Sequence, residues 1–181
     1  MIHAANLITI SRIILIFPVL LLVSEEKNLS NWLALILFVL AGITDNLDGY
    51  IARKTGTVSP LGALLDLMAD KLLVVIIISY LVSFTTNKYL VIPAMIMIFR
   101  ELAISAFRQF LTETKGSNPI KVSFIAKSKT ALQITALSFL IISPNFEDNF
   151  YVLTIVLFYM AAFASLYSLY GYIKTYKNYI K

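Results

Sequence analysis

Six long apolar segments, separated by polar turns, limit the folds open to this chain more than any other feature. Each segment is close to the roughly 20 residues that a helix needs to cross a lipid bilayer. The segments cover residues 7–23, 31–50, 60–84, 90–111, 124–143 and 150–172. Because lipid offers no hydrogen-bond partners to the backbone, spanning segments of this kind form helices. The pattern predicts an all-α polytopic membrane protein with six transmembrane helices.

The composition indicates a single membrane domain over residues 1–181. Hydrophobic residues make up 59% of the chain and charged residues only 14%, which leaves no room for a further soluble domain. We expect Met1 to Ala5 to form a short interfacial segment before the first helix. Cys is absent, which excludes disulfides and thiolate metal sites. The net charge of +5 favours anionic membrane lipids as partners, since no basic and aromatic array typical of nucleic-acid binding is present.

The distribution of basic residues predicts the orientation in the membrane. One side has only Lys27 and Lys88, next to several acidic residues. The other side collects Arg53, Lys54, Lys115, Lys121, Lys127, Lys129, Lys174, Lys177 and Lys181. Since cytoplasmic loops carry the excess of Lys and Arg, we expect both termini and the active site on the cytoplasmic side of the inner (cell) membrane.

Four aspartates in strongly apolar sequence are the candidate functional residues. Asp45 and Asp48 are three positions apart, and Asp66 and Asp70 are four apart, so each pair shares one face of a helix. Four clustered carboxylates repel one another, which predicts cations among them. Oxygen ligands favour hard divalent ions such as Mg²⁺, Mn²⁺ or Ca²⁺. A carboxylate-held metal pair is suited to displacement at phosphorus.

The same stretch resembles the signature of the CDP-alcohol phosphatidyltransferases. It reads Asp45-x-x-Asp48-Gly49-x-x-Ala52-Arg53, then eight residues, then Gly62-x-x-x-Asp66-x-x-x-Asp70. Every fixed position of the signature is present at its spacing. The resemblance implies a membrane enzyme that displaces CMP from a CDP-linked lipid with an alcohol, and it implies a homodimer.

The resemblance also implies a role for each residue of the signature. Two divalent cations, Mg²⁺ or Mn²⁺, would be held by Asp45, Asp48, Asp66 and Asp70. The CDP part of CDP-diacylglycerol would be contacted by Asp48, Gly49, Ala52, Arg53 and Gly62. Asp70 would be the general base for attack of the acceptor on the β-phosphorus. For Gly62, close packing of two helices is an alternative role.

Basic residues farther along the chain form a candidate acceptor site. They are Arg100, Arg108, Lys127 and Lys129. Glu101 neutralises one of them, and the remaining cations suit an acceptor that itself carries a phosphate. The alternative is that these cations balance the four aspartates or bind lipid phosphates.

Further motifs are similar to the bacterial CDP-diacylglycerol–glycerol-3-phosphate 3-phosphatidyltransferases. They include Arg100-Glu101, Ile104-Ser105-Ala106-x-Arg108 and Lys127-Ser128-Lys129-Thr130-Ala131-x-Gln133. This resemblance implies sn-glycerol 3-phosphate as the acceptor. The chain departs from the pattern at Ala126, usually Gly, and at Leu67-Met68, usually Pro-x. Alternatives are a relative using inositol phosphate, phosphatidylglycerol or serine, and a cation transporter, because membrane-embedded acids also line ion paths.

Two further patterns have more than one interpretation. Asn6, Thr9 and Arg12 recur every three residues and could share a face of the first helix, as in a run that opens many members of the resembling family. The alternative is a capping Asn and an Arg that reaches the lipid head groups. Trp32 and the tyrosines from Tyr167 to Tyr179 fit an aromatic belt at the membrane surface.

Overall fold

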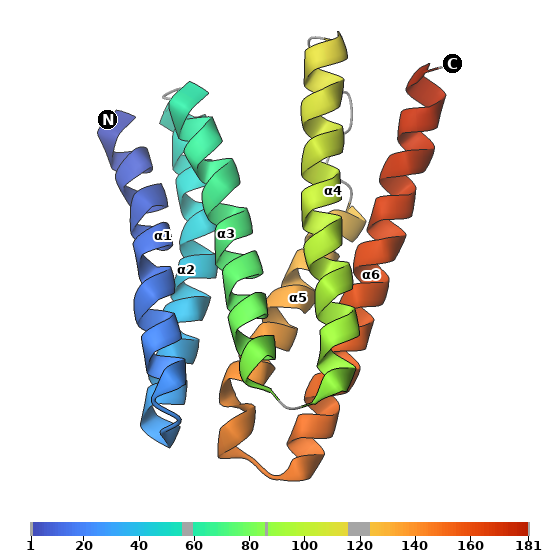
Figure 1. Ribbon diagram of the computed structural model, residues 1–181. Coiled ribbons are helices and arrows are strands. Elements are labelled where there is room, and N and C mark those ends of the chain that lie inside the picture. The colour runs from blue at the N-terminus through green and yellow to red at the C-terminus, as the bar shows by residue number, and fades with distance from the viewer. Residues whose placement is uncertain (1, 56–59, 86, 116–123, 181) are drawn as a thin grey trace. The chain divides into compact units, whose positions relative to one another are not determined.

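The structure is a computed structural model that describes the backbone of residues 2–55, 60–85, 87–115 and 124–180. Side chains are described for residues 9–44, 65, 68–69, 71–85, 87–110 and 129–174. Within these ranges every regular element is a helix (Figure 1). The elements are α1 (Ile2–Ser24), α2 (Asn28–Thr55), α3 (Pro60–Phe84), η1 (Lys88–Leu90), α4 (Val91–Lys115), α5 (Phe124–Ile142), η2 (Ser143–Asn145) and α6 (Asp148–Ile180).

The six α-helices lie where the apolar segments predict them, and most extend beyond those segments. Helix α2 continues to Thr55 and α6 to Ile180. The expectation of a separate segment before the first helix is wrong, because α1 already begins at Ile2. No Gly or Pro occurs between Ile2 and Phe17, so nothing in the local sequence interrupts the helix there.

Proline marks the beginning of three helical elements. Pro60 is the first residue of α3, Pro93 lies in the first turn of α4, and Pro144 lies at the beginning of η2. The first backbone N–H groups of a helix have no acceptor within the helix, so a proline there removes no hydrogen bond. These positions help to fix where α3, α4 and η2 begin.

The chain divides into two compact units. The first contains Met1–Phe84 and Leu137–Tyr151, and the second contains Thr85–Ala136 and Val152–Lys181. In the first unit, α1 packs against both α2 and α3 (Figure 1). The buried face of α1 follows the spacing of helix turns and comprises Thr9, Arg12, Ile16 and Val19. Two polar residues therefore lie in line with the apolar core of this unit.

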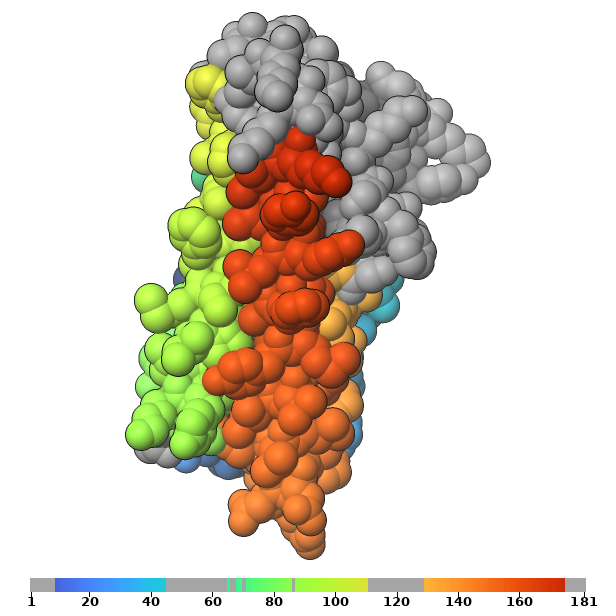
Figure 2. Space-filling model, turned by 90° about the vertical axis from the view of Figure 1, so that its right-hand side faces the viewer, coloured from blue at the N-terminus to red at the C-terminus, as the bar shows by residue number. Residues whose placement is uncertain are grey.

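In the second unit, α4 and α6 lie side by side (Figure 2), and both helices expose large apolar side chains. Among the described residues, two stretches, Lys88–Phe110 and Asp148–Lys174, are long and apolar enough to cross a membrane. Only 33% of the first apolar stretch and 39% of the second are buried, whereas the core helix of a soluble protein is mostly buried. On α4 the exposed residues follow a helical stripe: Ile92, Met95, Phe99 and Leu102. A stripe of this kind is suited to contact with lipid. Six membrane crossings remain a prediction.

Polar and aromatic contacts join α2 to η2 at one end of the first unit. The Asn31 amide nitrogen donates to Asn145 Oδ1 at 2.8 Å, and the Asn145 amide nitrogen donates to the Asn28 carbonyl at 3.1 Å. Beside them, the Phe146 ring lies 4.4 Å from the Phe150 ring and 6.2 Å from the Trp32 ring, measured between centroids. Asn31 is buried, so its amide depends on Asn145.

We expect Asn145→Ala to destabilise the protein by about 1–3 kcal/mol, because it leaves the buried Asn31 amide without its partner. The measurement is the thermal unfolding midpoint of the protein purified in detergent. Asn149→Ala is the matched control, since Asn149 is an exposed asparagine that lines the same surface pocket as Asn145. Equal midpoints for the two variants would show that the Asn31–Asn145 hydrogen bond does not stabilise the fold.

Candidate functional site

The backbone places the four aspartates on two helices of the first unit. Asp45 and Asp48 lie on α2, and Asp66 and Asp70 lie on α3. Each pair therefore shares a helix face, as its spacing predicts. Helix α1 packs against both of these helices. The four aspartate side chains lie outside the described residues.

The remaining residues of the predicted CDP site lie on the same two helices. Gly49, Ala52 and Arg53 belong to the last turns of α2, and Gly62 belongs to the first turn of α3. Their side-chain environments also lie outside the described part of the chain. Within the described side chains, no group of three or more His, Cys, Asp or Glu residues could hold a metal ion. The aspartates of α2 and α3 remain the candidate ligands, and an all-carboxylate set fits Mg²⁺ or Mn²⁺.

Arg12 is buried on α1, with 1% of its surface exposed. Thr9, one turn earlier, is buried as well. Their shared face is confirmed, and the interpretation of Arg12 as a residue that reaches the lipid head groups is wrong. The side chain of Asn6 lies outside the described residues. A buried guanidinium needs an anionic or polar environment, and α1 packs against the two helices that carry the aspartates.

A buried ionic cluster forms the centre of the second unit. Arg100 and Glu101 lie on α4, and Lys129 lies on α5. The Lys129 ammonium bonds Glu101 Oε1, and Arg100 Nη1 donates to the same carboxylate oxygen at 3.4 Å. The side chains of Arg100 and Lys129 are only 6% and 3% exposed. One carboxylate therefore serves two buried cations from two helices.

Helix α6 holds the arginines of α4 through two residues that the sequence analysis missed. Ser168 Oγ accepts a hydrogen bond from Arg100 Nη2 at 2.8 Å. Tyr172 Oη accepts one from Arg108 Nη2 at 3.0 Å, and the guanidinium carbon lies 5.8 Å from the centre of the tyrosine ring. Ser168 and Tyr172 are four positions apart, so they lie on one face of α6. That spacing, within a largely apolar stretch of α6, was the available signal.

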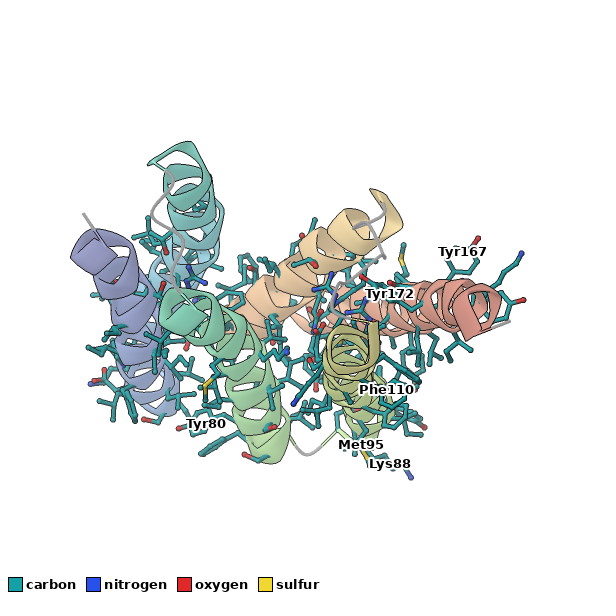
Figure 3. The ribbon with its side chains drawn as sticks, turned by 90° about the horizontal axis from the view of Figure 1, so that it is seen from above. Tyr80, Lys88, Met95, Phe110, Tyr167 and Tyr172 are labelled. Atoms are coloured by element: carbon teal, nitrogen blue, oxygen red, sulfur yellow. The ribbon has the colours of Figure 1, made fainter. Side chains whose placement is uncertain are left out.

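Tyr172 does not belong to the aromatic belt that the sequence predicts. It is only 7% exposed, and its ring packs with Ile104 and Leu169 in a small apolar cluster between α4 and α6. Tyr167 is 56% exposed and points away from α4, as an interfacial tyrosine would (Figure 3). A tyrosine that buries its ring and keeps its hydroxyl bonded to a cation acts within the protein rather than at its surface.

Three of the four predicted acceptor residues thus belong to one connected region of the second unit, and Lys127 lies outside the described side chains. Arg100, Arg108 and Lys129 carry three positive charges, and Glu101 carries one negative charge. Within the described side chains, Arg100 and Lys129 share the single carboxylate of Glu101. Buried cations in an apolar unit need negative charge or polar partners, and an acceptor site at these residues remains a prediction.

Comparisons with known proteins place these observations in context. Residues 2–167 match the family model described as CDP-alcohol phosphatidyltransferase. A CDP-diacylglycerol–glycerol-3-phosphate 3-phosphatidyltransferase of Rickettsia bellii (strain RML369-C) is 39% identical over 176 residues, which cover 96% of this chain and 95% of that protein. The protein of the same name from Haemophilus influenzae is 36% identical, and the match covers 94% of this chain and 91% of that protein. The protein of the same name from Shigella flexneri is 35% identical, and the match covers 93% of this chain and 91% of that protein.

We expect Glu101→Gln to destabilise the protein by about 3–5 kcal/mol, because it leaves Arg100 and Lys129 without their shared counter-charge. Adding Lys129→Met to this variant should restore part of the loss, since it removes one of the uncompensated cations. The measurement is the unfolding midpoint in detergent, and Glu147→Gln, at an exposed position, is the control. If Glu101→Gln unfolded at the wild-type midpoint, the carboxylate would not hold the cluster together.

Proposed function

Because the chain belongs to the CDP-alcohol phosphatidyltransferase family, we propose that it transfers the phosphatidyl group of CDP-diacylglycerol to sn-glycerol 3-phosphate, with release of CMP. Relatives that bear the name of this activity match the chain over almost its whole length. The products are phosphatidylglycerophosphate and CMP. The signature aspartates on α2 and α3 serve the nucleotide-activated donor, and the cationic region of the second unit serves the acceptor.

The observation that carries the choice of acceptor is that two buried cations, Arg100 and Lys129, share the single carboxylate of Glu101 within the described side chains. Arg108 lies about two turns farther along the same helix as Arg100. A phosphorylated acceptor supplies the missing negative charge, whereas a zwitterionic acceptor such as serine carries no net charge. Arginine suits this task because its planar guanidinium presents several N–H donors to phosphate oxygens. Arg100 bonds Ser168 through Nη2 and Glu101 through Nη1, and Arg108 bonds Tyr172 through Nη2. Lys127 is included in the acceptor site because it lies two residues before Lys129 in the sequence.

The donor side of the reaction follows from the residues of α2 and α3. Asp45, Asp48, Asp66 and Asp70 would hold two divalent cations, which supply charge neutralisation at the diphosphate of the donor. Gly49 and Ala52, with no side chain and a small one, would let the nucleotide approach α2 closely, and Asp48 would contact the CDP part as well. Gly62 would allow the same close approach on α3. Arg53 binds a phosphate or the carbonyl edge of cytosine through its fork of donors.

The transfer is a single displacement at the β-phosphorus. Asp70 accepts the proton of the acceptor's primary hydroxyl, and that oxygen forms a bond to the β-phosphorus. The bond from the β-phosphorus to the CMP oxygen breaks, and CMP leaves with the electron pair. No covalent intermediate with a protein nucleophile is needed.

The membrane arrangement proposed for this function has six crossings, both termini in the cytoplasm and a homodimeric assembly. The basic residues favour a cytoplasmic site, where nucleotide-activated lipid precursors are made. Besides the two long apolar stretches, Thr9–Ser24, Asn28–Thr44 and Lys71–Phe84 are shorter apolar helices within the described residues. Their full helices, α1, α2 and α3, have lengths that suit a bilayer crossing.

The function is tested by incubating the purified protein with CDP-diacylglycerol and one acceptor at a time. We expect CMP release with sn-glycerol 3-phosphate in the presence of Mg²⁺ or Mn²⁺, and none in excess EDTA. Asp66→Asn should lower the rate by more than about a hundredfold without lowering the unfolding midpoint. Faster turnover with serine, inositol phosphate or phosphatidylglycerol would assign a different acceptor. Full activity in EDTA would refute the role of the aspartates.

We expect Tyr172→Phe to lower kcat/KM for sn-glycerol 3-phosphate by about five- to tenfold, because Arg108 loses the hydroxyl that positions it. Phenylalanine keeps the ring beside the guanidinium, so the fold should be preserved. The KM for CDP-diacylglycerol should not change. Tyr167→Phe, at an exposed position, is the control and should behave as the wild type. Equal losses on both substrates would assign Tyr172 a purely structural role.

A further inference from the structure

Gln133 is a buried polar residue that the mechanism above does not use. It lies on α5 with 1% of its surface exposed, and its amide nitrogen Nε2 has no hydrogen-bond partner among the described residues. A buried amide without a partner is unfavourable for the fold, and most buried polar groups in proteins are paired. An amide retained under these conditions points to a partner that is present only when a ligand is bound.

The position of Gln133 relates it directly to the cationic region. It follows Lys129 by four residues on α5, so both lie on the same buried face, about 6 Å apart along the helix axis. Side chains of a helix lean toward its N-terminus, which brings the amide of Gln133 toward the turn of Lys129. A ligand whose phosphate is held by Lys129 and the arginines would therefore extend one helix turn to reach Gln133.

We propose that Gln133 Nε2 donates a hydrogen bond to the secondary hydroxyl of sn-glycerol 3-phosphate, and that this contact makes the site selective for a polyol phosphate. The inference rests on the proposed function. The phosphate and the primary hydroxyl of the acceptor are already used, by the cations and by the transfer reaction. The secondary hydroxyl lies between them on the carbon chain and is the remaining polar group of the acceptor.

The test compares two acceptors that differ only in this hydroxyl. The compound 3-hydroxypropyl phosphate has the phosphate and a primary hydroxyl but no secondary hydroxyl. For the wild type, kcat/KM should be roughly tenfold lower with 3-hydroxypropyl phosphate than with sn-glycerol 3-phosphate. Gln133→Met keeps the length of the side chain without its donor. In that variant kcat/KM for sn-glycerol 3-phosphate should fall by roughly the same factor, and the rate with 3-hydroxypropyl phosphate should not change.

Ser165→Ala is the matched control, because Ser165 on α6 is also fully buried and its hydroxyl also has no partner among the described residues. Both variants remove an unpaired buried group, so neither should lower the unfolding midpoint. Only Gln133→Met should change the preference between the two acceptors. The shift of the midpoint by each acceptor, measured without donor, gives a second readout and should show the same preference.

Three results would overturn the inference. Gln133→Met could reduce the use of both acceptors equally, which would mean that the residue acts through the fold. It could leave the preference of the wild type intact, which would mean that another group binds the hydroxyl. Ser165→Ala could alter the preference as much, which would mean that the effect is not specific to Gln133. A wild type that uses neither acceptor would refute the proposed function itself, and the role of Gln133 with it.

Discussion

The structure depends on how charge is buried in a chain that is largely apolar. Arg100 and Lys129 are almost fully enclosed, and the only carboxylate that bonds them within the described residues is that of Glu101. Removing a guanidinium or an ammonium from water is costly unless other polar groups take the place of the water. Glu101, together with Ser168, supplies those groups from two different helices. The positions of α4, α5 and α6 in the second unit are therefore tied to the chemistry of these few side chains.

The positive charge of Arg100 and Lys129 exceeds the negative charge of the one carboxylate that bonds them within the described residues. This difference bears on function. Two buried cations that share one carboxylate, as Arg100 and Lys129 share Glu101, would be a poor solution for a protein selected for stability alone. In the proposed function the same positive charge would be an advantage, because it would attract the phosphate of the acceptor. The buried, unpaired amide of Gln133 follows the same logic, because it lowers the stability of the empty site and gains a partner in the occupied one. At these few residues, groups that lower the stability of the empty protein are the groups proposed to bind the acceptor.

Sequence reasoning was most successful where a short-range rule applies. The lengths of the apolar segments predict six helices, and the spacing of Asp45, Asp48, Asp66 and Asp70 predicts two pairs on two helices. It failed where the outcome depends on residues far apart in the chain. Tyr172 was assigned to the surface because its partner Arg108 lies 64 positions away. Arg12 had two equal interpretations until the packing of α1 against α2 and α3 showed that it is buried.

The first unit is assembled from two pieces of chain that are far apart in sequence, and this has a consequence for biogenesis. Asn31 and Asn145, whose amides bond each other, are separated by 114 positions. During synthesis the first three helices leave the ribosome long before η2. The Asn31 amide therefore has no Asn145 to bond until η2 has been made. Until η2 is in place, the nascent chain lacks the partner of an amide that the finished protein buries. A chain truncated before η2 would therefore carry all the aspartates of its signature and still leave the Asn31 amide unsatisfied.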